Sequence, residues 1–195
     1  MRQPARLLQM ILVGASLLAG VARADDLTTC RRGSADDAIA ACSRLIAASG
    51  LGERDRARAF YNRANAYGTR GDRARSMADF DAAIALDPGF APALNDRGYA
   101  ALIQGDLDRA IADFDAALRI DPSFVNSYAH RGTAYLGKGD VDRAIADLDR
   151  AVRINPRYAH GFSLRGDYHL KRGNYHSAKV DYEACLLYTS DAADE

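Results

Sequence analysis

Apolar residues recur along this chain at the three- and four-residue spacing of an amphipathic α-helix. One such run lies between Asp106 and Asp121, and its apolar positions are Leu107, Ala110, Ile111, Phe114, Ala117 and Leu118. Asp106 can cap the start of this helix. The proline after Asp121 ends it, because proline lacks an amide donor and disfavours a helical conformation in the preceding residue. The helix before it is predicted from Pro92 to Gln104, followed by Gly105, which suits a left-handed C-terminal cap.

This helical hairpin recurs with a period of 34 residues. The period is marked by Asp87-Pro88, Asp121-Pro122 and Asn155-Pro156, and by glycine-polar pairs at Gly71-Asp72, Gly105-Asp106, Gly139-Asp140 and Gly173-Asn174. A fixed period of this length indicates stacked helical hairpins that bury a continuous core. We expect an array over residues 57–184, with complete hairpins at 57–90, 91–124 and 125–158. The fourth hairpin, at 159–184, breaks off inside its second helix.

The repeated positions resemble the signature of the tetratricopeptide repeat. Its small residue in the first helix falls on Ala64, Gly98, Gly132 and Gly166. Its small residue early in the second helix falls on Ser76, Ala110, Ala144 and Ala178, and its large apolar position on Phe80, Phe114, Leu148 and Tyr182. Ala101 and His169 depart from the signature, which usually has tyrosine there. The resemblance implies an all-α fold, an α-solenoid of helical hairpins wound into a right-handed superhelix.

The resemblance also implies a binding site, because in this family the first helices of the hairpins line a concave groove. The implied wall of that groove consists of Tyr61, Asn65, Asn95, Tyr99, Asn126, His130, Thr133, His160 and Asp167. Side chains of these types can hydrogen-bond an extended peptide or a partner helix. A basic clamp for a partner's terminal carboxylate is not expected, since Tyr61 stands where a lysine is needed and Asp96 would repel the carboxylate. The alternative is a solvated helix face with no preferred ligand.

Charged residues also recur with the repeat. Arginine occupies one position, at Arg63, Arg97, Arg131 and Arg165, and aspartate a second, at Asp79, Asp113, Asp147 and Asp181. A third position holds Asp81, Asp115 and Asp149. We interpret this pattern as a structural ladder of Arg–Asp contacts between paired helices, with partly exposed pairs that contribute about 0–1 kcal/mol each. The alternative is a charged stripe that binds a partner.

Residues 25–52 precede the array and contain one predicted helix, from Ser34 to Ile46, that copies the second-helix pattern. We expect this helix to be a lid on the first hairpin, because the end of a repeat array otherwise exposes its core. Cys30 and Cys42 lie in this segment. In an exported chain a disulfide between them is the leading interpretation. The alternative is that Cys42 is a small buried hydrophobic residue and Cys30 a free thiol.

Both ends of the chain carry segments that we expect to lie outside the fold. Arg2 and Arg6 precede an uncharged, mostly apolar run, and Ala22-Arg23-Ala24 fits a signal-peptidase site. Residues 1–24 are therefore predicted to be a signal peptide cleaved after Ala24, which leaves no membrane span and directs the chain to the periplasm or outside the cell. The alternative is an uncleaved anchor, for which the apolar run is short. Residues 185–195 resemble the translated end of a transposase-type sequencing adapter; the alternative is a genuine acidic tail.

Composition narrows the classes of function. Lys+Arg and Asp+Glu total 26 each, so the chain has no electrostatic reason to bind nucleic acid or an anionic membrane. No metal site or cofactor is expected, because the four histidines show no ligand spacing and the chain has no phosphate-binding loop. No nucleophile motif is present either, which argues against an enzyme.

The leading prediction is therefore a periplasmic or secreted scaffold or adaptor that binds a protein or peptide in its groove. One alternative is that the chain is the N-terminal regulatory region of a larger envelope enzyme or assembly. Another is a module that self-associates through its open C-terminal repeat.

Overall fold

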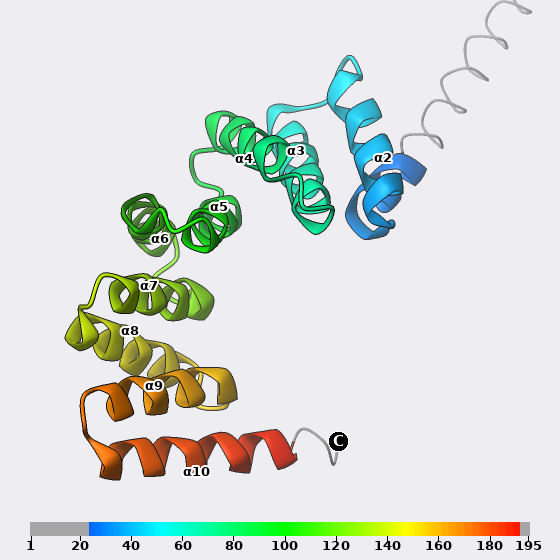
Figure 1. Cartoon of the computed structure of the whole chain (residues 1–195). Coiled ribbons are helices and arrows are strands. Elements are labelled where there is room, and N and C mark those ends of the chain that lie inside the picture. The colour runs from blue at the N-terminus through cyan, green and yellow to red at the C-terminus, as the bar shows by residue number, and fades with distance from the viewer. Residues whose placement is uncertain (1–23, 192–195) are drawn as a thin grey trace, which may run out of the picture. The chain divides into compact units, whose positions relative to one another are not determined.

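The computed structural model describes residues 24–191, and the elements of this part of the chain are all helices (Figure 1). The chain divides into two compact units, which meet at Pro88 and Gly89 and are described separately below. Unit 1 contains a helical segment at residues 24–32, then α2 (Ala35–Ala47), α3 (Glu53–Thr69) and α4 (Arg73–Leu86). Unit 2 contains α5 (Ala91–Ile103), α6 (Leu107–Ile120), α7 (Val125–Gly137), α8 (Val141–Ile154), α9 (Ala159–Lys171) and α10 (Tyr175–Asp191). The predicted signal peptide, apart from Ala24, lies outside the described residues.

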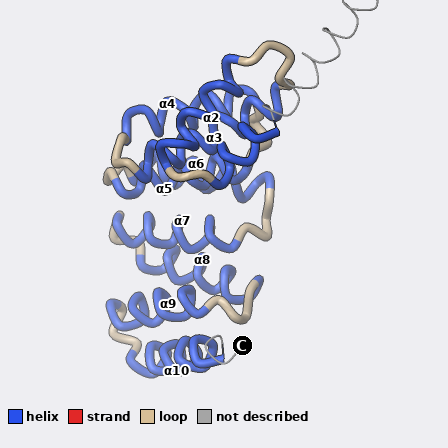
Figure 2. Tube along the Cα trace, turned by 90° about the vertical axis from the view of Figure 1, so that its right-hand side faces the viewer, coloured by secondary structure: helices blue, strands red, loops and turns tan. Residues whose placement is uncertain are grey.

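The helices confirm the predicted all-α solenoid of hairpins. In unit 2 each first helix packs on its own second helix, and successive hairpins stack in layers (Figure 2). Asp106 caps α6 by accepting a hydrogen bond from the Arg109 amide at 3.2 Å, and Gly105 adopts a positive φ of 81°. Only a residue without a Cβ takes that φ without strain, so the cap predicted from the glycine is the one observed.

Two helices extend beyond the predicted repeat limits. α3 begins at Glu53, ahead of residue 57, and its first turn carries Glu53 and Asp55, whose charges favour a helix N-terminus. α10 runs to Asp191 without a break, across the start of the predicted tail. There the Tyr188 ring stacks on Phe162 of α9, with ring centroids 5.8 Å apart. The origin of residues 185–195 stays a prediction.

Small residues of the repeat signature allow the paired helices to approach closely. A Cβ added to Gly98 of α5 would lie 2.9 Å from the ring of Phe114 on α6. A Cβ added to Gly132 would lie 3.0 Å from the backbone oxygen of Ala144, which cannot move away as a side chain can. Phe114 and Leu148 are consequently fully buried between the helices they join.

The predicted ladder of Arg–Asp contacts joins the two helices of every hairpin. In each hairpin the guanidinium group donates two hydrogen bonds to one carboxylate, and the pairs are Arg63–Asp79, Arg97–Asp113, Arg131–Asp147 and Arg165–Asp181. At Arg131 and Arg165 the remaining nitrogen also binds an aspartate of the preceding hairpin. Arg131 Nη1 lies 2.5 Å from Asp115, and Arg165 Nη1 lies 2.7 Å from Asp149.

The ladder pairs are more buried than the sequence suggested. The Arg131 side chain is 19% exposed and that of Asp147 is 10% exposed. Hydrogen bonding to Asp147 raises the pKa of Arg131 above its already high ordinary value, so the guanidinium remains charged. The estimate of 0–1 kcal/mol for an exposed pair therefore does not apply. Removal of one partner would leave a charge buried and uncompensated, a much larger cost.

We predict that Arg131→Ala lowers the free energy of unfolding by about 3–5 kcal/mol, because Asp147 is left without its cation. Arg172→Ala is the matched control. It also breaks an ion pair with an aspartate, Asp142, but the Arg172 side chain is 54% exposed, so a loss of about 0–1 kcal/mol is expected. Urea denaturation followed by circular dichroism measures both variants. Equal losses in the two variants would contradict a buried ladder.

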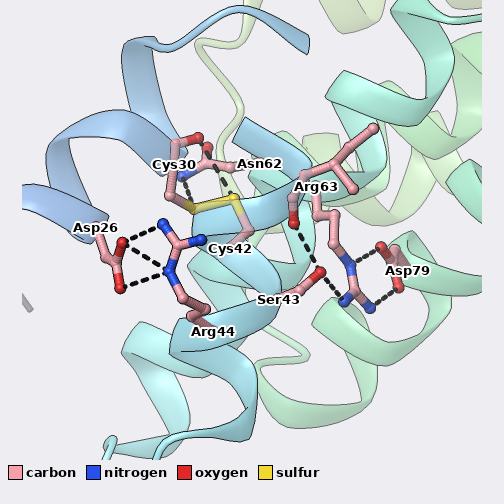
Figure 3. Close-up of a disulfide and its surroundings, with 9 residues drawn as sticks. Asp26, Cys30, Cys42, Ser43, Arg44, Asn62, Arg63 and Asp79 are labelled. Carbon is pink, nitrogen blue, oxygen red and sulfur yellow. Dashed lines mark hydrogen bonds and ion pairs between the residues drawn. A yellow bond between two sulfur atoms is a disulfide. The ribbon is translucent and has the colours of Figure 1, made fainter. Parts of the chain in front are cut away.

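In unit 1 a disulfide between Cys30 and Cys42 fastens the N-terminal helical segment to α2 (Figure 3). Both cysteines belong to a core cluster that includes Ala41, Leu45 and Ala59, so the Cys42 sulfur is buried as well as bonded. Asp26 of the same segment binds Arg44 of α2 at 2.6 Å. This arrangement agrees with a lid attached over the first hairpin. The alternative, in which Cys30 is a free thiol, does not hold in the structure, although Cys42 is buried as that alternative expected.

Ser43 of the lid takes part in the ladder. It follows Cys42 as Asp115 follows Phe114, so it occupies the repeat position whose aspartates reach the next arginine. Arg63 Nη1 donates to Ser43 Oγ at 2.8 Å (Figure 3). The lid therefore supplies a neutral acceptor where the repeats of unit 2 supply a carboxylate.

We predict that the protein, produced in an oxidising compartment and unfolded in urea without reductant, reacts with iodoacetamide at Cys185 alone. After reduction all three cysteines should react. The double variant Cys30→Ser/Cys42→Ser should lose about 3 kcal/mol of stability on a chain-entropy model. Cys185→Ser should lose little by comparison. Intact mass spectrometry reads the adducts, and three adducts without reductant would refute the bridge.

Candidate functional site

The first helices of unit 2 lie next to one another. α5 contacts α7, and α7 contacts α9, whereas within residues 89–191 no comparable contact joins α6 to α8 or α8 to α10. Residues on the first helices therefore form a continuous surface across three repeats, which we call the first-helix face. Its members at two repeat positions are Asp96, His130 and Leu164 in one row, and Tyr99, Thr133 and Asp167 in the other. The two rows share a side of each helix because they are three residues apart.

An aromatic stack stands at the centre of this face. Tyr99 is 45% exposed, and its ring lies over the His130 imidazole, with ring centroids 4.7 Å apart and an interplanar angle of 31°. Behind His130 lies the buried ring of Phe114, at 5.6 Å. Tyr99 thus remains largely exposed to solvent, while its ring is held by a side chain that is itself packed against Phe114.

The buried side chain of Asn95 helps to orient the His130 imidazole. Asn95 is only 3% exposed, so the structure places it inside the repeat, with no direct part in a solvent-facing wall. Its Oδ1 accepts a hydrogen bond from Ser127 Oγ at 2.8 Å and lies 3.4 Å from Nδ1 of His130. Its Nδ2 donates to Asp96 at 2.9 Å. Because an amide oxygen is an acceptor only, a neutral His130 places its proton on Nδ1 and leaves Nε2 as an acceptor.

The surroundings of His130 favour the neutral imidazole. Burial is the largest effect and lowers the pKa of His130 below its ordinary value; Asp96 opposes this shift and His160 adds to it. A histidine with a lowered pKa is neutral at physiological pH. The stack therefore carries no positive charge.

The far end of the face is ordered by two tyrosines. Tyr168 donates from its hydroxyl to Thr133 Oγ1 at 3.0 Å, which links α9 to α7. Tyr182 of α10 donates to Asp167 at 2.6 Å, and this hydrogen bond raises the pKa of Tyr182 to about 12. The Asp167 carboxylate is thus held in place on the exposed surface of α9.

The other predicted wall residues are distributed between the two units. Asn126 and His160 are exposed on α7 and α9, and the His160 ring lies edge-on to Tyr158 at 6.0 Å. Tyr61 and Asn65 belong to α3 of unit 1. Tyr61 packs near Phe80 at 6.1 Å, and Asn65 is exposed. The part of the predicted wall that the structure brings together is therefore the part in unit 2.

Among residues 24–191 no cluster of three or more histidine, cysteine, aspartate or glutamate side chains is placed to hold a metal ion. None of the described helices is long and apolar enough to cross a membrane.

The family follows from comparison with known proteins. Two tetratricopeptide-repeat family models match the chain, over residues 61–123 and 101–168. The chain belongs to the tetratricopeptide-repeat family. Comparison with curated protein sequences gave no significant match.

Solved tetratricopeptide-repeat structures share the fold. A MamA double mutant from strain RS-1 superposes with a TM-score of 0.76 at 19% identity, covering 91% of this chain and 97% of its own. MamA from Desulfovibrio magneticus RS-1 gives 0.74 at 20% identity, with 89% and 96% covered. The first tetratricopeptide domain of Spaghetti (RPAP3), bound to an HSP90 peptide, gives 0.60 at 17% identity, with 62% and 95% covered. At these identities the likeness establishes the fold alone.

The buried state of His130 predicts a loss of stability in acid. Its pKa is lower in the folded protein than the value of about 6.5 in an unfolded chain. Between those two values the unfolded chain binds more protons, so stability falls as the pH drops below about 6.5. The charges that act on the imidazole are those of Asp96 and His160, and the titratable ring that lies against it is that of Tyr99. NMR titration of His130, assigned through His130→Gln, should give a midpoint below 6.5, and His130→Gln should lose less stability than the wild type between pH 7 and 5. A midpoint at or above 6.5 would contradict the structure.

Proposed function

We propose that the chain is an exported scaffold that binds a protein or peptide segment on the first-helix face of unit 2. The observation that carries the proposal is the stack of Tyr99 on His130. Tyrosine supplies a large contact area that loses little conformational entropy on binding, and such residues recur as anchors in protein interfaces. Tyr99 is already oriented by His130, Asn95 and Ser127, so less ordering remains to be done when a partner binds.

Family membership supports this role. The tetratricopeptide-repeat domain of RPAP3 was solved in complex with the HSP90 peptide SRMEEVD, so a domain of this fold can bind a peptide. In the proposed role the chain catalyses no reaction. The polar groups around its central histidine hydrogen-bond one another, and they hold side chains in position.

Export is part of the proposal and rests on two features. Residues 1–24 have the charged start, apolar run and small-residue site of a secretory signal. The pairing of Cys30 with Cys42 fits an oxidising compartment, where disulfides persist.

The intact-mass measurement that counts free thiols also tests export, because cleavage after Ala24 gives a chain that starts at Asp25. A secreted chain that keeps its N-terminus would refute cleavage after Ala24, and absence of the chain from the exported fraction would refute export.

Site-specific photo-crosslinking tests the binding face. A photoreactive amino acid at position 99 should crosslink a protein partner in the native host, whereas the same residue at position 120 should not. Ile120 is the matched control, because it is 44% exposed, close to the 45% of Tyr99, but lies on the second helix α6.

The expected result is a discrete crosslinked band from position 99, lost when His130→Ala removes the support of the stack. A band of equal strength from position 120, or none from position 99 in a correctly folded protein, would overturn the proposed face. Circular dichroism of the purified variants separates a lost interaction from lost folding.

A further inference from the structure

We infer that unit 1 holds a second binding site, a pocket beside the disulfide that takes a small aliphatic carboxylate. The pocket lies between the N-terminal helical segment and α3, includes Leu45 of α2 in its lining, and has a volume of about 370 Å³. Small-molecule sites of this size combine an apolar lining with a few polar groups that orient the ligand. The site belongs to unit 1 alone, so the inference goes beyond the proposed function and does not depend on it.

The deeper part of the pocket lining is apolar. Leu45 and Ala59 are each only 2% exposed, and both belong to the core cluster that contains Cys30. Leu27, on the N-terminal segment, also lines the pocket but is 46% exposed. An aliphatic chain in the pocket would cover Leu27 and contact the core side chains behind it, and burial of apolar surface of this kind favours binding.

The rim of the pocket carries one cation that has no counter-ion. Arg31 is exposed, and no aspartate or glutamate in residues 24–191 pairs with it. The other two charged lining residues, Asp55 and Arg58, bind each other at 3.4 Å. One positive charge is therefore left over in the lining. It matches a carboxylate, which carries a single negative charge, better than a phosphate, which carries nearly two.

Asn62 of α3 adds a neutral donor to the lining. Its Nδ2 donates to Cys30 Sγ at 3.8 Å, so the amide lies against the disulfide (Figure 3). An amide nitrogen carries two hydrogens, and one of them therefore remains for a ligand. Arg31 and Asn62 together can donate to a carboxylate, and hydrogen bonds to an ionised acceptor are the stronger kind. An aliphatic alcohol would use only the apolar part of the pocket, and an inorganic anion only its rim.

Cleavage of the predicted signal peptide would leave the pocket in place. Of the described lining residues only Ala24 belongs to that peptide, and it is exposed. Its carbonyl oxygen accepts a hydrogen bond from Oγ1 of Thr28, another lining residue, at 3.2 Å. A chain that begins at Asp25 would release this hydroxyl and place an α-ammonium group next to the position of Ala24. Both changes favour an anionic ligand.

The test is a titration of the purified protein with octanoate, followed by two-dimensional NMR of its amide groups at about pH 7, where an aliphatic carboxyl group is ionised. The signals of Leu27, Ala59 and the Asn62 side chain should shift and saturate. Acetate keeps the carboxylate without the chain, and octanol keeps the chain without the charge. Each should bind at least about tenfold more weakly than octanoate.

Arg31→Gln should raise the Kd for octanoate about threefold or more, the effect of one lost charge pair. Arg32→Gln is the matched control, because Arg32 is the next residue and is also exposed but lies outside the lining, so the Kd should not change. Leu27→Ser should likewise raise the Kd about threefold or more. Its control is Ile103→Ser, at an apolar side chain that is 57% exposed on α5 of unit 2. All four side chains are exposed, so the variants should fold, which circular dichroism checks.

Saturable shifts at the pocket that weaken in Arg31→Gln and Leu27→Ser, but not in their controls, are the expected result. Absence of saturable octanoate binding overturns the inference, as do equal binding of octanol or equal losses in Arg31→Gln and Arg32→Gln. Tighter binding of the peptide acid acetyl-Leu-Leu than of octanoate overturns the assignment to a small ligand in favour of a peptide terminus. Crosslinking at position 99 reports on unit 2 and is unaffected by any of these results.

Discussion

The fold depends on the bidentate contact between an arginine of each first helix and an aspartate of the following second helix. Two helices that meet through alanine and glycine could shift along one another, because small side chains interlock too little to define the register. A guanidinium that donates two parallel hydrogen bonds to one carboxylate fixes both distance and angle. In Arg131 and Arg165 the third nitrogen binds the preceding hairpin as well, so one side chain sets the register within a repeat and between repeats. Because the pair is buried, it must be complete; either member alone would be costly.

The lid shows how the ladder ends. A carboxylate in place of Ser43 would repeat the pattern of Asp115, yet the hydroxyl suffices because Arg63 already has Asp79 as its counter-ion. The lid has no carboxylate at this position, but it has a covalent link, since the disulfide between Cys30 and Cys42 joins it to the segment before it. A terminal unit packs on one neighbour only and gains less from burial than an internal repeat does. A short-range disulfide is a physically reasonable compensation, because it restricts the unfolded chain instead of adding contacts.

The repeat architecture and the ladder partners could be predicted because both depend on period and residue type alone. Glycine before Asp106 and proline after Asp121 limit a helix by backbone geometry, whatever surrounds them. The burial of the ladder could not be predicted, since it depends on how closely the helices approach one another. Gly98 and Gly132 allow that close approach, but its extent is known only once the atoms that face these glycines are known. The candidate site was predicted less well for the same reason. Asn95 and Tyr99 lie four residues apart on one helix, yet Asn95 is buried against Ser127 and Tyr99 is exposed to solvent. The 34-residue register that aligns Tyr99, Thr133 and Asp167 was readable from the sequence, but the hydrogen bond from Tyr168 to Thr133 was not.

The ladder also determines the chemistry of the binding face. The chain has as many basic as acidic residues, so its neutrality says nothing about local charge. Along α5, α7 and α9 every arginine is used to hold a second helix, and the aspartates that bind those arginines lie on the opposite, buried side. The arginines of the first helices are therefore bound inside the hairpins and are not available to a partner. The residues that stabilise the solenoid therefore also limit what its binding face can offer, because their guanidinium groups already donate to aspartates of the second helices.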